Sequence, residues 1–149
     1  MSVSRGGSEE LSKWLDRMVL KVAPEDAGKL HAKVHIQVGD GVILDTPVGN
    51  PDLWESPPPK NYVGGRARGN WQSTIDTIPS EEMALSEDPS GEGRSRQEDA
   101  EVIADRIDPG DVSYITNNVP YIERLNDGWS TQAPAAFVQA NIQRVAAQF

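Results

Sequence analysis

One interrupted block of the sequence constrains the fold more than any other stretch. It begins with Asp45-Thr46-Pro47-Val48 and continues, after an insertion, with Gly64-Gly65-Arg66-Ala67-Arg68-Gly69-Asn70-Trp71-Gln72. Proline cannot continue a helix and biases the residue before it toward extended geometry, whereas glycine permits backbone conformations that other residues avoid. The block therefore predicts an element that stops near Thr46, a flexible loop, and a sharp re-entry into a strand near Asn70.

A second block completes the pattern. It comprises Ile115-Thr116-Asn117-Asn118-Val119-Pro120-Tyr121, Gly128-Trp129-Ser130 and Gln132-Ala133-Pro134. In this order the two blocks resemble the signature of the tail-completion and head–tail joining (neck) proteins of long-tailed bacteriophages, in which TPV leads directly into a TGRARGNW-like segment. The resemblance spans nearly the whole chain. The chain departs from the family at residues 49–63, where a proline-rich loop with Pro57-Pro58-Pro59 is inserted.

The resemblance implies a structural protein of the virion and no enzymatic activity. It implies a ring, of six copies, that completes the tail and joins it to the head. The ring would contact the tail tube and the head-closure and connector proteins, and phage DNA would pass through it without sequence recognition. Assembly would take place in the host cytoplasm, with no cofactor and no membrane. Residues that match the family pattern are expected to specify the fold: Thr46, Pro47, Gly65, Asn70, Trp71, Asn117, Pro120, Tyr121, Trp129 and Pro134.

Two other classes of function stay open. The first is a neighbouring role in the same particle, as a tail terminator or a minor tail protein. The second, more distant, is a small metal-binding protein or hydrolase. His31 and His35 are four residues apart and would share one face of a helix or a strand. No third ligand has a recognisable spacing, and the sequence places no serine near either histidine, so neither a metal site nor a catalytic triad is predicted.

The composition of the chain bears on these classes of function. The chain has 149 residues, which is the size of one domain. Its formal net charge is -9, whereas a protein that grips DNA is expected to be basic. An acidic surface is compatible with a channel through which DNA slides without binding. The absence of cysteine excludes disulfides and thiolate metal sites, and we expect neither a membrane span nor an apolar signal segment.

Apolar residues at helical spacing predict two helices in the N-terminal part of the chain. Residues 1–7 are expected to form a flexible arm. A helix is predicted from Ser8 to about Lys21, and its apolar stripe is Leu11, Trp14, Leu15, Met18 and Val22. Pro24 begins a second helix.

Residues 30–45 are ambiguous in sequence. Val34, Val38 and Val42 recur at helical steps, but Val34, Ile36 and Val38 also alternate, as they would in a strand before a hairpin turn at residues 39–41. The dense β-branched residues favour a strand slightly. The phage family implies a long helix that ends before Pro47, and we predict that helix, with a defect at the two glycines, Gly39 and Gly41.

The C-terminal half is predicted to alternate strands, helices and turns. A strand is expected over Asn70–Ile78 and a mobile, charged loop over residues 81–96. The elements expected after it are a helix over Gln97–Ile107, a turn at Asp108–Asp111, a strand over Val112–Thr116, a left-handed turn at Asn117-Asn118, a short helix over Tyr121–Leu125, and a turn at Asn126–Gly128. The last helix is expected to be capped by Ser130 or Thr131, with Pro134 in its first turn and a stripe of Val138, Ile142, Val145 and Phe149. The whole is an α+β fold, with N-terminal helices on a small antiparallel sheet and a C-terminal helix that closes the core.

Five residues are candidates for contacts with other subunits or neck proteins. Trp54 and Tyr62 are large aromatic residues on the inserted loop, where they either fold back onto the body or contact a neighbour. Arg66 and Arg68 either pair with carboxylates of the same chain or reach a neighbouring subunit. Phe149 ends the chain and either folds back or meets another subunit.

Overall fold

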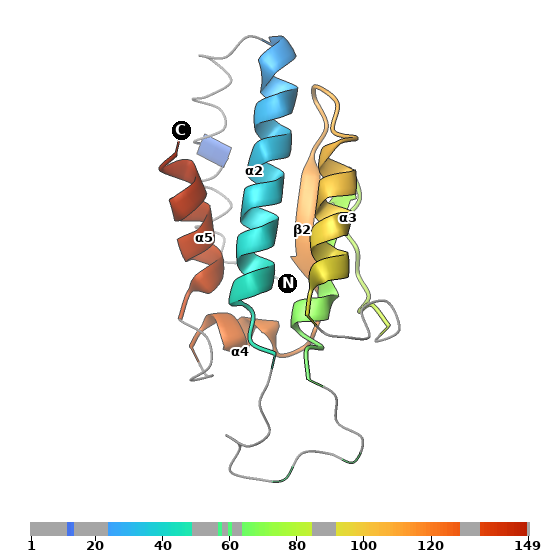
Figure 1. The fold of residues 1–149 in the computed structure, drawn as a ribbon, viewed down its shortest axis with the longest axis vertical. Helices are drawn as coiled ribbons and strands as arrows, with labels where there is room; N and C mark the ends of the chain where they lie inside the picture. Colours follow the sequence, from blue (N-terminus) through green and yellow to red (C-terminus); the bar gives the residue numbers. More distant parts are fainter. Residues whose placement is uncertain are drawn as a thin grey trace.

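The computed structural model describes residues 12–13, 24–48, 57, 60, 64–84, 92–128 and 135–148 (Figure 1). Its elements in chain order are α2 (Pro24–Asp45), the 3-10 helix η2 (Arg68–Asn70), β1 (Trp71–Ile75), α3 (Arg94–Ala104), β2 (Ser113–Asn117), α4 (Ile122–Asn126) and α5 (Phe137–Ala146). Helices pack against a two-stranded antiparallel sheet, so the predicted α+β fold is confirmed. The predicted arm, most of the first predicted helix and most of the inserted loop lie outside the described residues.

The ambiguous stretch before the first block is a helix. α2 runs unbroken for 22 residues, and Val34, Val38 and Val42 are all buried on one of its faces. α2 packs against both α3 and α5. A hairpin over the same residues would have placed these three valines on a sheet, whereas the helix gathers them into a single stripe. This stripe faces a cleft that Val138 of α5 and Ile115 of β2 also line.

The predicted defect at the two glycines is wrong, because the helix continues through them. At Gly39 a Cβ atom would lie 3.5 Å from the side chain of Ala100 on α3. At Gly41 a Cβ atom would overlap the side-chain amide of Asn141 on α5. The glycines therefore serve the close approach of two other helices, and this packing offsets their low helix propensity.

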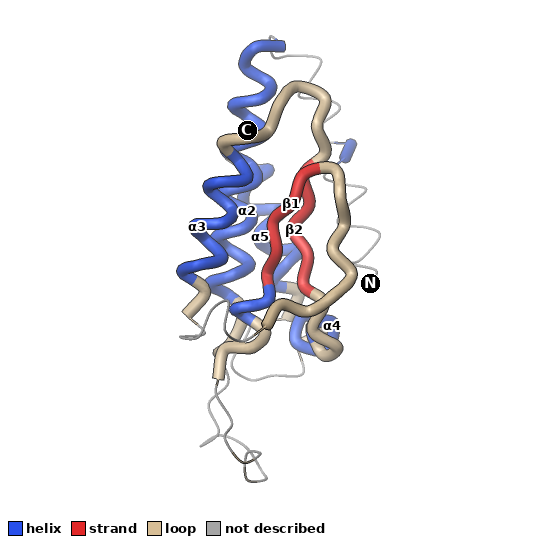
Figure 2. The backbone as a smooth tube through the Cα atoms, turned by 90° about the vertical axis from the view of Figure 1, so that its right-hand side faces the viewer, coloured by secondary structure: helices blue, strands red, loops and turns tan. Residues whose placement is uncertain are grey.

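The sheet joins the two sequence blocks. β1 and β2 pair antiparallel, with Trp71 opposite Asn117 and Ile75 opposite Ser113. Figure 2 shows α2 and α3 on one side of the two strands. The predicted strand to Ile78 is too long, because Asp76 adopts φ 60° and turns the chain. The Asp76 amide donates to the Val112 carbonyl oxygen (2.7 Å), and its side chain accepts from the Val112 amide (2.9 Å), which closes the end of the sheet.

The predicted mobile loop over residues 81–96 is wrong at both of its described ends. α3 begins at Arg94, and the side chain of Arg96 is buried. At the other end, the amide of Met83 donates to Asn70 Oδ1 (2.7 Å), and the carbonyl of Glu81 accepts from Gln72 Nε2 (2.8 Å). Side chains of the first sequence block therefore hold residues 81–83 beside β1.

The predicted left-handed turn at Asn117-Asn118 is also wrong. Among the non-glycine residues that the structure describes, only Asp76 and Ala136 have positive φ. Asn117 instead turns the chain with its side chain, whose Oδ1 accepts from the amide of Val119 (3.1 Å). An asparagine can satisfy a turn in this way without leaving the ordinary backbone regions.

The short helix and the turn after it are confirmed by α4 and by Gly128, whose φ is 88°. The predicted cap of the last helix is wrong, since α5 begins at Phe137 and its N-cap residue is Ala136. The side chain of Asn126 provides the capping oxygen, which accepts from the amide of Val138 (3.0 Å). The predicted stripe is buried at Val138 and Val145, whereas Phe149 lies outside the described residues.

Candidate functional site

The first sequence block ends α2 in a buried polar junction centred on Thr46. The Thr46 side chain is fully buried. Its Oγ1 donates to the carbonyl of Val42 (2.5 Å) and accepts from the indole Nε1 of Trp71 (2.7 Å). Because a buried polar group is costly without a partner, this arrangement demands both a hydroxyl at residue 46 and a hydrogen-bond donor at residue 71.

Arg68 satisfies the C-terminal end of α2. Its Nε donates to the carbonyl of Thr46 (2.8 Å), and its terminal nitrogen donates to the carbonyl of Leu44 (3.0 Å). The last carbonyls of a helix have no partner within the helix and carry partial negative charge. Arg68 thus caps α2 from a distant part of the chain, a role that the sequence analysis did not foresee for it.

The glycine-arginine segment returns the chain in a tight turn. Gly65 has φ 93°, a left-handed conformation that other residues rarely adopt, and its amide donates to the carbonyl of Val48 (2.6 Å). Asn70 Nδ2 donates to the carbonyl of Arg66 (2.8 Å). The two ends of the insertion at residues 49–63 therefore meet in a closed base, at Val48 and Gly65.

Asn117 connects the second block to the first. Its Nδ2 donates to the carbonyl of Ala67 (2.8 Å), and its side chain is fully buried. Pro120 is exposed, and Tyr121 is half-buried against the core. Asn118 extends the connection, because its Nδ2 donates to the carbonyls of Pro79 (2.9 Å) and Glu81 (3.1 Å).

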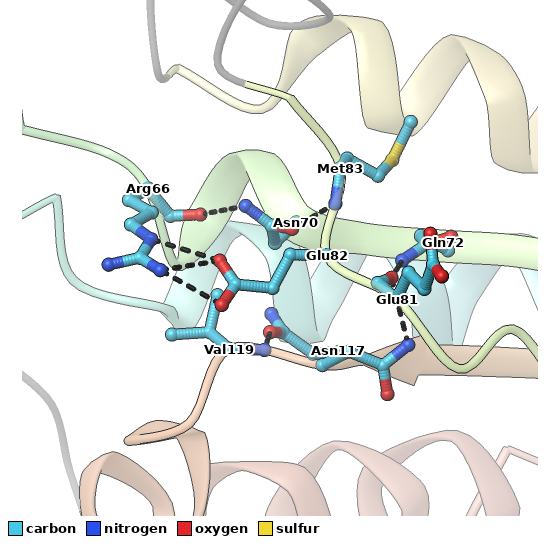
Figure 3. Close-up of polar contacts among 9 residues, drawn as sticks. Arg66, Asn70, Gln72, Glu81, Glu82, Met83, Asn117 and Val119 are labelled. Carbon is cyan, nitrogen blue, oxygen red and sulfur yellow. Dashed lines mark hydrogen bonds and ion pairs between the residues drawn. The ribbon is translucent and has the colours of Figure 1, made fainter.

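Arg66 lies on the surface above this junction. Its guanidinium pairs with both carboxylate oxygens of Glu82, at 2.6 to 3.0 Å, as Figure 3 shows. It also lies 5.8 Å from the centroid of the Tyr121 ring, which is within cation–π range. The ion pair with Glu82 raises the pKa of Arg66 further above its ordinary value. Half of the Arg66 side chain is still exposed, so a neighbouring molecule can reach it.

The remaining candidates cannot be placed. Trp54, Tyr62 and Phe149, and the motif residues Trp129 and Pro134, lie outside the residues that the structure describes. Among the candidates that are placed, Thr46, Gly65, Asn70, Trp71 and Asn117 are buried and take part in the hydrogen bonds above.

A second site, which the sequence analysis missed, surrounds the two histidines. His31 Nε2 and His35 Nδ1 lie 2.8 and 2.9 Å from the hydroxyl oxygen of Ser113 on β2. The expectation that no serine lies near them is therefore wrong. Ser113 is 78 residues beyond His35, so only the placement of β2 against α2 brings the three side chains together, and no local signal in the sequence reports it.

The three side chains border a cleft of about 670 Å³, between α2, α5 and β2. His35 is 3% exposed, and its Nε2 has no hydrogen-bond partner among the described residues. Burial, and then the proximity of His31, lowers the pKa of His35 to about 4. Burial also lowers the pKa of His31, while the carboxylate of Asp111 opposes that shift.

This chemistry limits what the histidine site can do. Both imidazoles are neutral at pH 7, and a histidine whose pKa is near 4 is a weak general base at that pH. Within the described part of the chain, no group of three or more histidine, cysteine, aspartate or glutamate side chains could hold a metal ion. The Ser113 hydroxyl can donate to one imidazole and accept from the other, so the cluster is a polar contact between α2 and β2 in which Nε2 of His35 has no partner among the described residues.

Comparison of the chain with models of protein families, with curated proteins and with solved structures finds no match. Among the described residues, no helix has the length and apolar character needed to cross a membrane.

Proposed function

We propose that this chain is a structural protein of a long-tailed bacteriophage that acts at the junction of head and tail. It completes the tail as part of a ring of six copies and joins the tail to the head-closure and connector proteins. Phage DNA passes through the ring without sequence recognition, and the net charge of -9 suits such a passage. The protein needs no cofactor and catalyses no reaction.

The observation that carries the proposal is the convergence of the two sequence blocks that resemble the phage family. Trp71 of the first block hydrogen-bonds Thr46 across the insertion, and Asn117 of the second block hydrogen-bonds Ala67 of the first. Residues that are far apart in sequence but match one family pattern thus share one buried junction. This is the arrangement expected if the pattern records a common fold rather than a chance similarity.

The surface beside the junction supports a role in assembly. Figure 1 places the end of α2, η2 and α4 at one end of the molecule. At this end Leu44 is 54% and Val48 is 37% exposed, next to the closed base of the insertion. Two exposed apolar side chains in one region are compatible with a contact surface. We assign this end, with the insertion and Arg66, to contacts between subunits.

Electron microscopy of particles from a phage that lacks this gene tests the proposal. We expect DNA-filled heads beside unattached tails of normal length. Tails of uncontrolled length would instead indicate a tail terminator. Intact and infectious particles would contradict a structural role in the neck and would reopen the metal-binding and hydrolase alternatives.

The closed base allows a sharper test of the insertion. Replacement of residues 49–63 by a single glycine would leave Val48 and Gly65 as the first and fourth residues of a β-turn, which keeps their observed hydrogen bond. We expect a folded protein that no longer forms rings. A variant with a glycine-serine loop of the original length separates the effect of loop length from that of its side chains. Normal rings from both variants would contradict a contact role for the insertion.

A further inference from the structure

The cleft between α2, α5 and β2 has the size and the lining of a binding site for a small molecule. Its volume is about 670 Å³, and ligand pockets in proteins usually have volumes of about 300 to 1,000 Å³. One wall is the valine stripe of α2, formed by Val34, Val38 and Val42, and Figure 1 shows α5 and β2 on either side of that helix. Ile78 also lines the cleft and is 61% exposed, so the cleft opens to solvent there.

The lining of the cleft carries no charge at pH 7. Among the described residues that line it, none is an aspartate, a glutamate, a lysine or an arginine. Its two histidines, His31 and His35, are neutral at this pH, because burial lowers the pKa of each imidazole. An ion that left water for the cleft would lose its hydration without gaining a partner of opposite charge, which is costly. The lining therefore favours an uncharged occupant.

Two buried polar atoms beside the apolar walls can hold one polar group of that occupant. His35 is 3% exposed and its Nδ1 lies 2.9 Å from the hydroxyl oxygen of Ser113, but its Nε2 has no hydrogen-bond partner among the described residues. The Oγ1 atom of Thr116, which also lines the cleft, is likewise buried without a partner there. A buried polar group is costly without a hydrogen bond, and a ligand that provides one removes that cost.

We infer that the cleft binds an uncharged, mainly apolar small molecule that carries one hydroxyl group, and that this hydroxyl hydrogen-bonds Nε2 of His35. A hydroxyl group can both donate and accept, so it suits either tautomer of the imidazole. The apolar body of the molecule lies against the valine stripe and against Ile115, Val138 and Ile142. Apolar walls with a few placed polar groups are the usual design of a ligand pocket. The inference does not depend on the proposed phage function.

Three aromatic probes with the same fused-ring body test the inference on the full-length chain at pH 7. Naphthol carries one hydroxyl group, naphthalene carries none, and naphthoate carries a charged carboxylate. Equilibrium dialysis measures the binding of each probe. We expect naphthol to bind at one site per chain. Naphthalene should bind about five-fold more weakly, as the loss of one hydrogen bond implies, and naphthoate at least about ten-fold more weakly, because its charge would be buried. Absence of naphthol binding would overturn the inference, and so would equal binding of all three probes.

A substitution that narrows the cleft tests where naphthol binds. Ile142→Trp places a larger side chain on a wall of the cleft and should weaken naphthol binding at least about ten-fold. Val102→Trp is the matched control, because Val102 lies on α3, is 48% exposed and does not line the cleft. It should leave binding unchanged. Circular dichroism and thermal unfolding establish that both variants are folded. Undiminished binding to folded Ile142→Trp would overturn the inference.

Nuclear magnetic resonance of the imidazole nitrogens tests the hydrogen bond without any change to the cleft, and it decides the matter if Ile142→Trp fails to fold. The chain has only two histidines, so selective isotope labelling gives few signals, and His31→Gln assigns them. Naphthol should shift the Nε2 signal of His35 more than naphthalene does, because only naphthol offers a hydrogen bond. Naphthol that binds without moving this signal would overturn the assignment of His35.

Discussion

The hydrogen bond between Thr46 and Trp71 offers the sharpest test of the junction, through the nearly isosteric substitution Thr46→Val. The substitution leaves the indole N–H of Trp71 buried without an acceptor, because Trp71 is 4% exposed. Such an unsatisfied donor costs about 1–3 kcal/mol. The Val42 carbonyl stays satisfied, since it also accepts from the amide of residue 46 (3.1 Å). The new methyl group recovers less than about 1 kcal/mol of apolar transfer energy.

The net loss is therefore about 1–2 kcal/mol, which in a chain of 149 residues lowers the melting temperature by roughly 2–8 °C. The free energy of unfolding is measured by urea denaturation, followed by far-ultraviolet circular dichroism with a check that the m-value is unchanged. Thr116→Val is the matched control, because the buried Thr116 hydroxyl has no hydrogen-bond partner among the described residues. Its removal should be neutral or stabilising.

A double-mutant cycle isolates the contact. In a Trp71→Phe background no indole N–H remains, so Thr46→Val should lose most of its cost. An equal loss of stability in both backgrounds would refute the reasoning. So would a loss no greater than that of Thr116→Val, since both substitutions remove a buried hydroxyl group and only that of Thr46 has hydrogen-bond partners.

Three further predictions use other contacts. Gly41→Ala should destabilise the protein despite the higher helix propensity of alanine, because its Cβ atom would overlap a side-chain amide of α5. Gly28→Ala is the control, because its Cβ atom would have no neighbour within 4 Å. It should raise the free energy of unfolding by about 0.5–1 kcal/mol, measured by thermal unfolding. The pKa of His35 falls from about 6.5 in the unfolded chain to about 4 in the folded protein. The stability that the neutral His35 side chain contributes, roughly 3 kcal/mol, is therefore present above pH 6.5 and is lost as the pH falls toward 4. We expect the free energy of unfolding, measured by urea titration, to decrease less between pH 7 and pH 4.5 for His35→Gln than for the parent chain. Glu82→Gln should cost less than about 1 kcal/mol, because its ion pair with Arg66 is solvent-exposed, and a larger cost would mean that this pair supports the turn beneath it.

The fold could be predicted from sequence where a local pattern was strong. Asp108–Asp111 combines proline and glycine with aspartate, and the predicted turn forms there, with the amide of Asp111 bonded to the carbonyl of Asp108 (3.0 Å). The local patterns of α2 conflicted. Its β-branched residues favoured a strand slightly, whereas the helical recurrence of its valines and the family resemblance favoured the helix that the structure contains. Packing of α3 and α5 decided the outcome, and neither partner is visible in the local sequence.

The helix ends show one physical cause of error, which is that a distant side chain does what a local residue was expected to do. Asn126 caps α5 in place of Ser130 or Thr131, and Arg68 caps α2. These side chains hydrogen-bond the backbone groups at a helix end that have no partner within the helix. Local rules expect a residue close in sequence to provide that hydrogen bond. Local rules therefore predict that a helix end needs a partner, but they cannot predict which residue provides it.

The two candidate sites differ in how they could be found, and this difference bears on function. The junction at Thr46 is built from residues that a sequence pattern marks, and its contacts fix the ends of the inserted loop. The contact of His31 and His35 with Ser113 has no such pattern, yet it brings together groups that in isolation suggest catalysis. Burial holds both imidazoles neutral and lowers the pKa of His35 to about 4, so the cluster is better suited to joining α2 to β2 than to moving protons at pH 7. The buried polar contacts of the described residues thus hold elements of the fold together, which is compatible with the structural role proposed above.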